Sequence, residues 1–240
     1  SYERGRLVFK GFSAYPASNR VEYVNKGAYY WKGPEDCSFT VNSVYDEQNL
    51  YFTVTVTDDA VVPCACDSCA CDFVELWIDA GQSEEPENRW VRKGKRIKFE
   101  EPATEGIYNF KFSPGDCYAI KPYVKEFASS DEIDTFQTET VKSIKVVSSL
   151  KKTGYEMKFK IPFSIFGWES VPSDSKNFTQ FSAAVVVHDV DNVYRPEEES
   201  QIATSSFDPE KPTTYGTLVL IPKDQWYGSA DNVFIDDITK

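Results

Sequence analysis

The sequence contains few of the residues on which many enzymes depend. Histidine and methionine each occur once in 240 residues, as His188 and Met157. It also has no nucleophile elbow, no His-Glu-x-x-His motif and no phosphate-binding glycine loop. No apolar run approaches the roughly 18 residues of a membrane span. These features argue against a membrane-spanning protein and against the common enzyme classes. The chain has no signal-like start and begins at Ser1, so we expect a processed or trimmed form.

Positive charge is also scarce. The chain carries 26 lysines and arginines against 38 acidic residues, a net charge of −12 and a pI near 4.7. Because binding to a phosphate backbone requires a basic surface, we expect no nucleic-acid partner. The densest basic run, residues 89–98, lies between acidic stretches and is typical of a solvated hairpin.

Short segments of alternating polarity dominate what is present. In residues 50–57 every second side chain is apolar, which is typical of a half-buried antiparallel strand. Residues 72–79 repeat the pattern and leave four side chains together on the opposite face, which we expect to be exposed: Phe73, Glu75, Trp77 and Asp79. A carboxylate and an indole therefore share one surface.

The remaining strands can be placed by the same signals. We predict them at residues 6–11, 20–24, 37–44, 106–112, 117–124, 134–148, 155–161, 181–188 and 215–221. Residues 80–105 are expected to form a long loop or weak ribbon, and 163–168 a single helical turn. The nearly continuous apolar run 181–188 predicts a central strand buried on both faces. The fold class is therefore an all-β, antiparallel, jelly-roll-like sandwich over residues 1–222, with a linker and strand-like tail over 223–240.

A series of motifs over roughly residues 30–222 resembles the family 9 carbohydrate-binding modules. The series runs Asp46-Glu-x-Asn-Leu-Tyr-Phe52, Asp58-Asp59, Asp72-Phe-Val-Glu-Leu-Trp-Ile-Asp79, Gly154-Tyr-Glu, Ile161-Pro162, Asp189-x-Asp191 and Tyr215-Gly-Thr-Leu-Val-Leu. The resemblance implies a β-sandwich that grips the end of a glycan between two aromatic walls. It also implies a carboxylate with amide and basic groups on adjacent strands, and often a structural calcium ion.

The resemblance assigns roles to particular positions. Glu75 matches the family's site carboxylate, and Asn109 and Lys111 stand where the family has an amide and an arginine. A carboxylate accepts hydrogen bonds from sugar hydroxyls, a lysine donates, and an aromatic ring covers the C–H face of the sugar.

The aromatic walls depart from the family pattern. Where the family has its first stacking tryptophan, this chain has a cysteine segment without an aromatic residue. The second wall belongs in residues 205–214, where Phe207 is available. Trp77, on the strand face, and Trp90, in the long loop, are the candidates to replace the missing tryptophan.

Six cysteines are present, four of them in the segment Cys64-Ala-Cys-Asp-Ser-Cys-Ala-Cys71. A two-residue turn at its centre would pair Cys66 with Cys69 and Cys64 with Cys71, at the Cα separation of about 5.5 Å that disulfides accept. Cys37 and Cys117 would form the third disulfide. An even cysteine number favours an oxidising, extracytoplasmic compartment, so we expect a secreted or cell-surface protein. The alternative is a four-thiolate Zn²⁺ or Cu⁺ site in a reducing compartment.

Hard oxygen donors are concentrated after the apolar run. Asp189, Asp191 and Asn192, with residues 197–199, could bind calcium, the one cofactor we expect, or form a solvated acidic loop. His188 and Met157 fall on predicted core strands, and we interpret both as core residues rather than as haem ligands.

Two functions are consistent with these patterns. The leading one is an extracellular, non-catalytic module that recognises glycan or polysaccharide ends. The alternative is a surface or matrix protein that self-assembles into oligomers or filaments through terminal strands and calcium. In that case the strand-like residues 232–238 would pair with a neighbour's sheet edge instead of closing their own domain.

Overall fold

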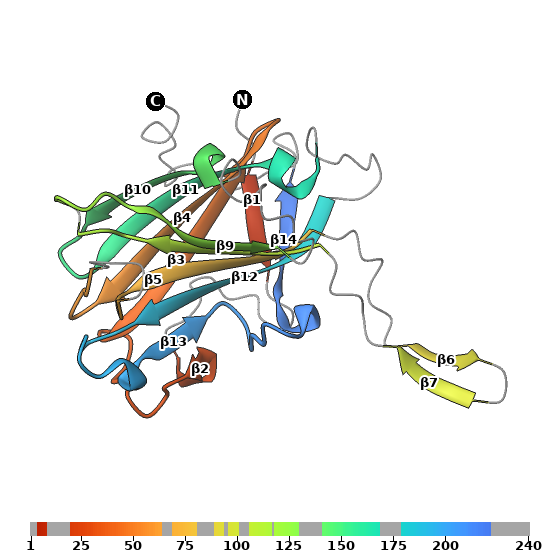
Figure 1. The fold of residues 1–240 in the computed structure, drawn as a ribbon, viewed down its shortest axis with the longest axis horizontal. Coiled ribbons are helices and arrows are strands. Elements are labelled where there is room, and N and C mark those ends of the chain that lie inside the picture. Colours follow the sequence, from red (N-terminus) through yellow and green to blue (C-terminus); the bar gives the residue numbers. More distant parts are fainter. Residues whose placement is uncertain are drawn as a thin grey trace.

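The computed structural model describes residues 4–8, 20–63, 69–80, 89–93, 96–100, 106–116, 118–129, 141–168 and 179–221. These residues form two large antiparallel β-sheets and a separate two-stranded hairpin, with short 3₁₀ turns, which confirms the predicted β-sandwich (Figure 1). Among them, no helix is long and apolar enough to cross a membrane. The predicted tail, residues 223–240, lies outside the described residues, so its role in assembly stays a prediction.

The four-stranded sheet, called sheet A, has the order β10-β11-β4-β3. Its strands are β3 (Cys37–Tyr45), β4 (Asn49–Asp58), β10 (Lys145–Leu150) and β11 (Tyr155–Pro162). The predicted core face of β4 is confirmed, because Phe52 opposes Phe159 and Val54 opposes Met157, all buried in the core. Met157 is thus a core residue, as predicted. The expectation of a half-buried strand is wrong for its first half, because Tyr51 and Thr53 on the opposite face are buried as well.

The larger sheet, called sheet B, has the order β1-β14-β12-β5-β8-β9, with β13 beside β12 and β2 beside β13. Its strands are β1 (Arg4–Val8), β2 (Val24–Lys26), β5 (Phe73–Asp79), β8 (Ile107–Ser113), β9 (Tyr123–Ser129), β12 (Thr179–Asp189), β13 (Ser200–Ala203) and β14 (Gly216–Ile221). Strand β12 pairs with β5 along one edge and with β14 and β13 along the other. The prediction of a central strand over 181–188 is therefore confirmed.

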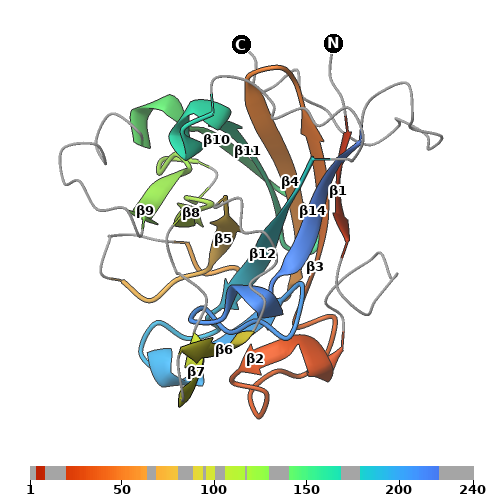
Figure 2. The same ribbon diagram turned by 90° about the vertical axis from the view of Figure 1, so that its right-hand side faces the viewer.

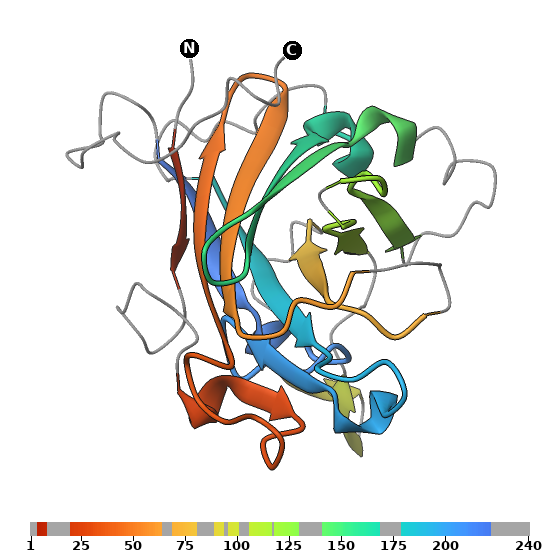
Figure 3. The same ribbon diagram turned by 90° about the vertical axis from the view of Figure 1, so that its left-hand side faces the viewer.

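The hydrophobic core lies between the two sheets, which form two facing layers in Figures 2 and 3. Phe112 of sheet B stacks on Phe159 of sheet A, with ring centroids 4.2 Å apart. Both rings are fully buried, and each such side chain contributes about 1.5–3 kcal/mol when removed from water. This core makes sheet B a firm support for the side chains on its outer face.

Four regions differ from the sequence prediction. In the predicted strand pair 134–148, residues 141–143 are helical and β10 begins at Lys145, while residues 134–140 lie outside the described residues. Residues 21–23 form a 3₁₀ turn, η1 (Val21–Tyr23), instead of a strand, and β9 begins at Tyr123 instead of residue 117. The short strand β13 was not predicted. Further 3₁₀ turns are η2 (Phe163–Phe166), at the predicted helical turn, η3 (Pro196–Glu198) and η4 (Pro212–Thr214).

The predicted weak ribbon within 80–105 is present as β6 (Arg89–Lys93) paired with β7 (Arg96–Glu100). In Figure 1 this hairpin stands apart from both sheets. The hairpin expected for the basic run 89–98 is therefore confirmed.

Candidate functional site

Two adjacent strands bring four of the predicted site residues together on the outer face of sheet B. In the register of β5 and β8, Glu75 lies opposite Lys111 and Trp77 lies opposite Asn109. Because side chains alternate along a strand, all four point to the same side of the sheet. The sequence alone placed Glu75 and Trp77 on one face, and the resemblance placed the other two residues beside them.

Glu75 is held as an ionised hydrogen-bond acceptor. Its side chain is 7 % exposed, the Trp77 indole donates to Oε2 at 2.7 Å, and Lys111 Nζ lies 3.7 Å from Oε1. Burial alone would raise the pKa of Glu75, but His188, Trp77 and Lys111 together hold it below its usual value. The expectation of an exposed face is wrong here, because Glu75 and Asp79 are both buried.

Asn109 presents a polar atom that the protein does not satisfy. The residue is 4 % exposed, and its Nδ2 has no hydrogen-bond partner among the described residues. A buried amide left without an acceptor costs about 1–3 kcal/mol. An arriving hydroxyl oxygen would relieve that cost, which makes Asn109 a natural donor to a ligand.

Three aromatic rings flank these polar groups. The ring centroids of Trp77 and Phe207 are 5.5 Å apart, and Tyr215 lies 5.2 Å from Phe207 and 6.3 Å from Trp77. Phe207 thus lies beside Trp77, as the resemblance implied, whereas Tyr215 was not predicted for the site. Trp90 belongs to β6, and its side chain lies outside the described part of the structure, so its role in the site stays a prediction.

His188 was missed because its strand is so apolar that it was assigned to the core. The residue is buried, but it lies on the outer face of sheet B, where its Nδ1 is 2.5 Å from Glu199 Oε1. Its Nε2 is 3.5 Å from Glu75 Oε1, an ion-pair distance, and has no hydrogen-bond partner among the described residues. Phe73 stacks on the imidazole at 3.9 Å between ring centroids. Burial lowers the pKa of His188, but the two glutamates raise it overall.

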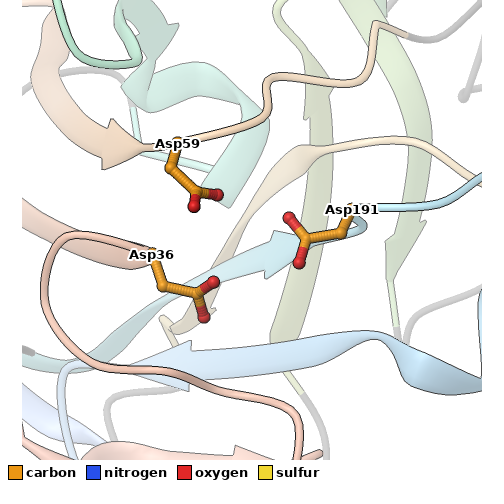
Figure 4. Close-up of side chains that lie close together, drawn as sticks. All are labelled: Asp36, Asp59 and Asp191. Atoms are coloured by element: carbon orange, nitrogen blue, oxygen red, sulfur yellow. The ribbon is translucent and has the colours of Figure 1, made fainter.

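Two groups of three aspartates lie at one end of the sandwich. The outer group comprises Asp36, Asp59 and Asp191, whose carboxylates face one another in Figure 4. The inner group comprises Asp58, Asp72 and Asp189 and is buried throughout. In each group the carboxylate oxygens lie within 4.8 Å of one another, close enough for one metal ion.

The outer group already contacts a cation of the protein itself. Lys32 Nζ lies 3.2 Å from Asp36 Oδ1 and 2.7 Å from Asp191 Oδ2, and these two carboxylates raise the pKa of the lysine. Asn192 accepts the backbone N–H of Tyr194 at 2.9 Å. Of the predicted calcium ligands, Asp189 belongs to the inner group and Asp191 to the outer group, and a shared set with Asn192 stays a prediction. Glu199, the last residue of the acidic stretch 197–199, contacts His188 instead.

The inner group is held by neutral donors. The backbone N–H groups of Ala60, Val62 and Val190 and the hydroxyl of Ser200 donate to its three carboxylates at 2.5–2.9 Å. Asp189 Oδ1 and the fully buried hydroxyl of Tyr155 have no hydrogen-bond partner among the described residues. Burial raises the pKa of Asp189 to about 7, with Asp58 adding to the effect.

The Tyr155 hydroxyl lies in the electrostatic field of the same group. Burial raises its pKa, and the negative charges of Asp72, Asp58 and Asp189 raise it further. A buried set of hard oxygens with two unpartnered members fits a calcium ion, which takes six to eight oxygen ligands.

The comparisons with known proteins agree with this architecture. The sequence profile of the family described as "Carbohydrate family 9 binding domain-like" matches residues 13–223. The chain belongs to this family. Comparison with curated protein sequences gives no match.

Solved structures of family 9 carbohydrate-binding modules are similar to this chain at low sequence identity. A module from Caldicellulosiruptor kristjanssonii in complex with cellotriose is 13 % identical with a TM-score of 0.48, covering 91 % of this chain and 85 % of that one. A module from the same organism in complex with glucose is 14 % identical with a TM-score of 0.47, covering 96 % of each chain. The family assignment therefore comes from the profile match.

The cysteines of this family 9 domain differ in part from the prediction. Cys37 is a buried free thiol, so the predicted Cys37–Cys117 disulfide is wrong. Its side chain, at the start of β3, packs into the core between the sheets. Cys69 and Cys71 are disulfide-bonded, but Cys64 and Cys66 lie outside the described residues, so their pairing stays a prediction.

Proposed function

We propose that this domain binds a carbohydrate on the outer face of sheet B, in an extracellular setting and without catalysing a reaction. Membership of the family supports carbohydrate recognition. The observation that carries the proposal is the pairing of an ionised Glu75 with the unpartnered Asn109 amide, beside the rings of Trp77 and Phe207.

Each group has a chemical role toward a sugar. Glu75 Oε1 accepts from ligand hydroxyls, while the amide of Asn109 and the ammonium of Lys111 donate to hydroxyl oxygens. Trp77, with Phe207 and Tyr215 packed around it, offers an apolar ring surface to the C–H face of a pyranose. The combination selects a polyhydroxylated ligand with one apolar face.

Two observations support a non-catalytic and extracellular role. The chain belongs to a family described by carbohydrate binding, which supports a binding rather than a catalytic role. The disulfide-bonded state of Cys69 and Cys71 is consistent with an oxidising compartment.

Calcium is the cofactor that we propose, and the inner aspartate group is its site. The carboxylate oxygens would come from Asp58, Asp72 and Asp189. The negative charges of these three residues also act on the buried hydroxyl of Tyr155. Bound there, the ion would neutralise buried negative charge between β4, β5 and β12 and so stabilise one end of the sandwich. The proposed site takes Asp189 from the predicted set and combines it with Asp58 and Asp72.

A glycan array followed by calorimetry tests the proposed sugar site. Glucose and cellotriose, the ligands of the similar modules, are the first defined sugars to measure. We expect Glu75→Ala to weaken sugar binding about 10- to 100-fold, because a hydrogen bond to a charged group contributes roughly 1.5–3 kcal/mol. Glu75→Gln should lose less, since it keeps the shape and one acceptor.

Glu156→Ala is the matched control, since this glutamate lies on sheet A in an ion pair with Lys151. It should leave sugar affinity unchanged. A Glu75→Ala protein that binds sugars as tightly as the parent would show that the site is elsewhere.

A further inference from the structure

The inner aspartate group and the proposed sugar site are connected through three pairs of consecutive residues. The pairs are Asp72 with Phe73, His188 with Asp189, and Glu199 with Ser200. One member of each pair is at the inner group: Asp72 and Asp189 belong to it, and Ser200 donates a hydrogen bond to Asp189. The other member is at the histidine: Phe73 and Glu199 contact His188, which is itself the third. Since successive side chains of a strand point to opposite sides, one backbone segment serves both sites.

The residues in contact with His188 connect directly to Glu75, the carboxylate of the proposed sugar site. Glu199 accepts from Lys26 at 2.5 Å and lies at the same distance from His188 Nδ1. The other ring nitrogen, Nε2, faces Glu75 Oε1 at 3.5 Å, and Phe73 covers one face of the ring. The orientation of Glu75 therefore depends on where His188 is held.

We propose that a divalent cation in the inner aspartate group fixes the position of Glu75 through His188 and Glu199, so that the cation and the sugar bind cooperatively. The part of this inference that concerns sugar binding rests on the proposed function. His188 is a positioning residue, since its imidazole is buried and acts through Glu75. The link from the cation to His188 can be measured without any sugar.

The physical reason is repulsion among buried carboxylates. Asp58, Asp72 and Asp189 are buried with carboxylate oxygens within 4.8 Å of one another, so like charges would repel at this site without a cation. A cation would draw the three carboxylates around itself and so shift the adjoining ends of β5 and β12. Because the interior is close-packed, Phe73 and His188 must follow their neighbours Asp72 and Asp189.

The single histidine of the chain gives a direct test. In the full chain treated with a chelator and then titrated with Ca²⁺, NMR of the imidazole nitrogens reports on His188 alone. We expect its resonances to shift and to saturate at one equivalent of calcium. Asp189→Asn should abolish both the calcium binding and the shift, whereas Asp191→Asn, in the Lys32-paired outer group, should keep both.

Calcium that binds at one equivalent without moving the His188 resonances would overturn the inference, as would the absence of calcium binding. Far-UV circular dichroism checks that each variant is folded. The comparison of the parent protein with and without calcium gives a result even if Asp189→Asn does not fold.

Calorimetry with cellotriose, in calcium and in chelator, tests the coupling to the sugar. We expect about tenfold tighter binding in calcium, within the roughly 5- to 150-fold range of allosteric coupling, and cellotriose must raise calcium affinity by the same factor. His188→Ala should remove the coupling while calcium still binds, and His188→Gln, which keeps a donor, should restore part of it.

Equal cellotriose affinity in calcium and in chelator would overturn the coupling and leave the sugar site standing. A protein that binds no sugar in either condition would overturn the proposed function instead. The NMR titration then still decides whether the cation controls His188.

Discussion

At the scale of single residues, burial changes what a side chain can do. Cys37 is fully buried, and this burial, with nearby Asp189, Asp58 and Asp72, raises the pKa of its thiol well above the usual value. The thiolate is the reactive form of cysteine, so a buried thiol among carboxylates is chemically inert.

We expect Cys37 to resist iodoacetamide at pH 8 in the folded protein and to react once the protein is unfolded in urea. Peptide mapping by mass spectrometry identifies the modified residue in both states. Rapid alkylation of Cys37 in the folded state would contradict the buried position. Recovery of Cys37 in a disulfide with Cys117 would contradict the free thiol.

At the scale of elements, the turn between β10 and β11 shows how a glycine permits close packing. Gly154 has a φ of +96°, and an added Cβ would lie 2.2 Å from the backbone oxygen of Val56 on β4. The turn therefore needs both the left-handed backbone and the missing side chain, because it packs against a strand of the same sheet.

Gly154→Ala is expected to lower the free energy of unfolding by about 2–4 kcal/mol, from backbone strain together with the clash. Gly167→Ala is the matched control, since Gly167 has a φ of +73° but nothing within 4 Å of an added Cβ. Gly167→Ala should lower the free energy of unfolding by only about 1 kcal/mol. Urea unfolding measures both, and equal losses would show that the contact with Val56 is unimportant.

At the scale of the whole molecule, the inner aspartate group links stability to pH. In the folded state burial raises the pKa of Asp189 from its ordinary value of 3.8 to about 7. Between these two values the folded state binds more protons than the unfolded state, so stability falls as pH rises.

In chelator, we therefore expect the free energy of unfolding to decrease from about pH 4 to pH 7 and to level off above. Asp189→Asn should flatten this slope, and Asp191→Asn should preserve it. Calcium at about a hundred times its dissociation constant should raise the free energy of unfolding by roughly 2.7 kcal/mol. Thermal or urea unfolding over this pH range is the measurement, and a rise in stability from pH 4 to 7 in chelator would contradict the inner site.

The sequence by itself determined the strands and the side chains that share a face. Alternation with a period of two is a local property, so β4, β5 and β12 could be predicted from their own residues, and Glu75 and Trp77 were placed together. The family resemblance added Asn109 and Lys111, which the register of β5 and β8 then placed beside them.

Only the tertiary structure decided which distant residues meet. Asp58, Asp72 and Asp189 come together because β4 and β12 end, and β5 begins, at the same end of the sandwich, and the order of these strands in the sheets is not encoded in any local pattern. For the same reason the sequence could not separate Asp189 from Asp191, or place His188 beside Glu75. These contacts depend on strand order and register, which the packing of the whole chain sets.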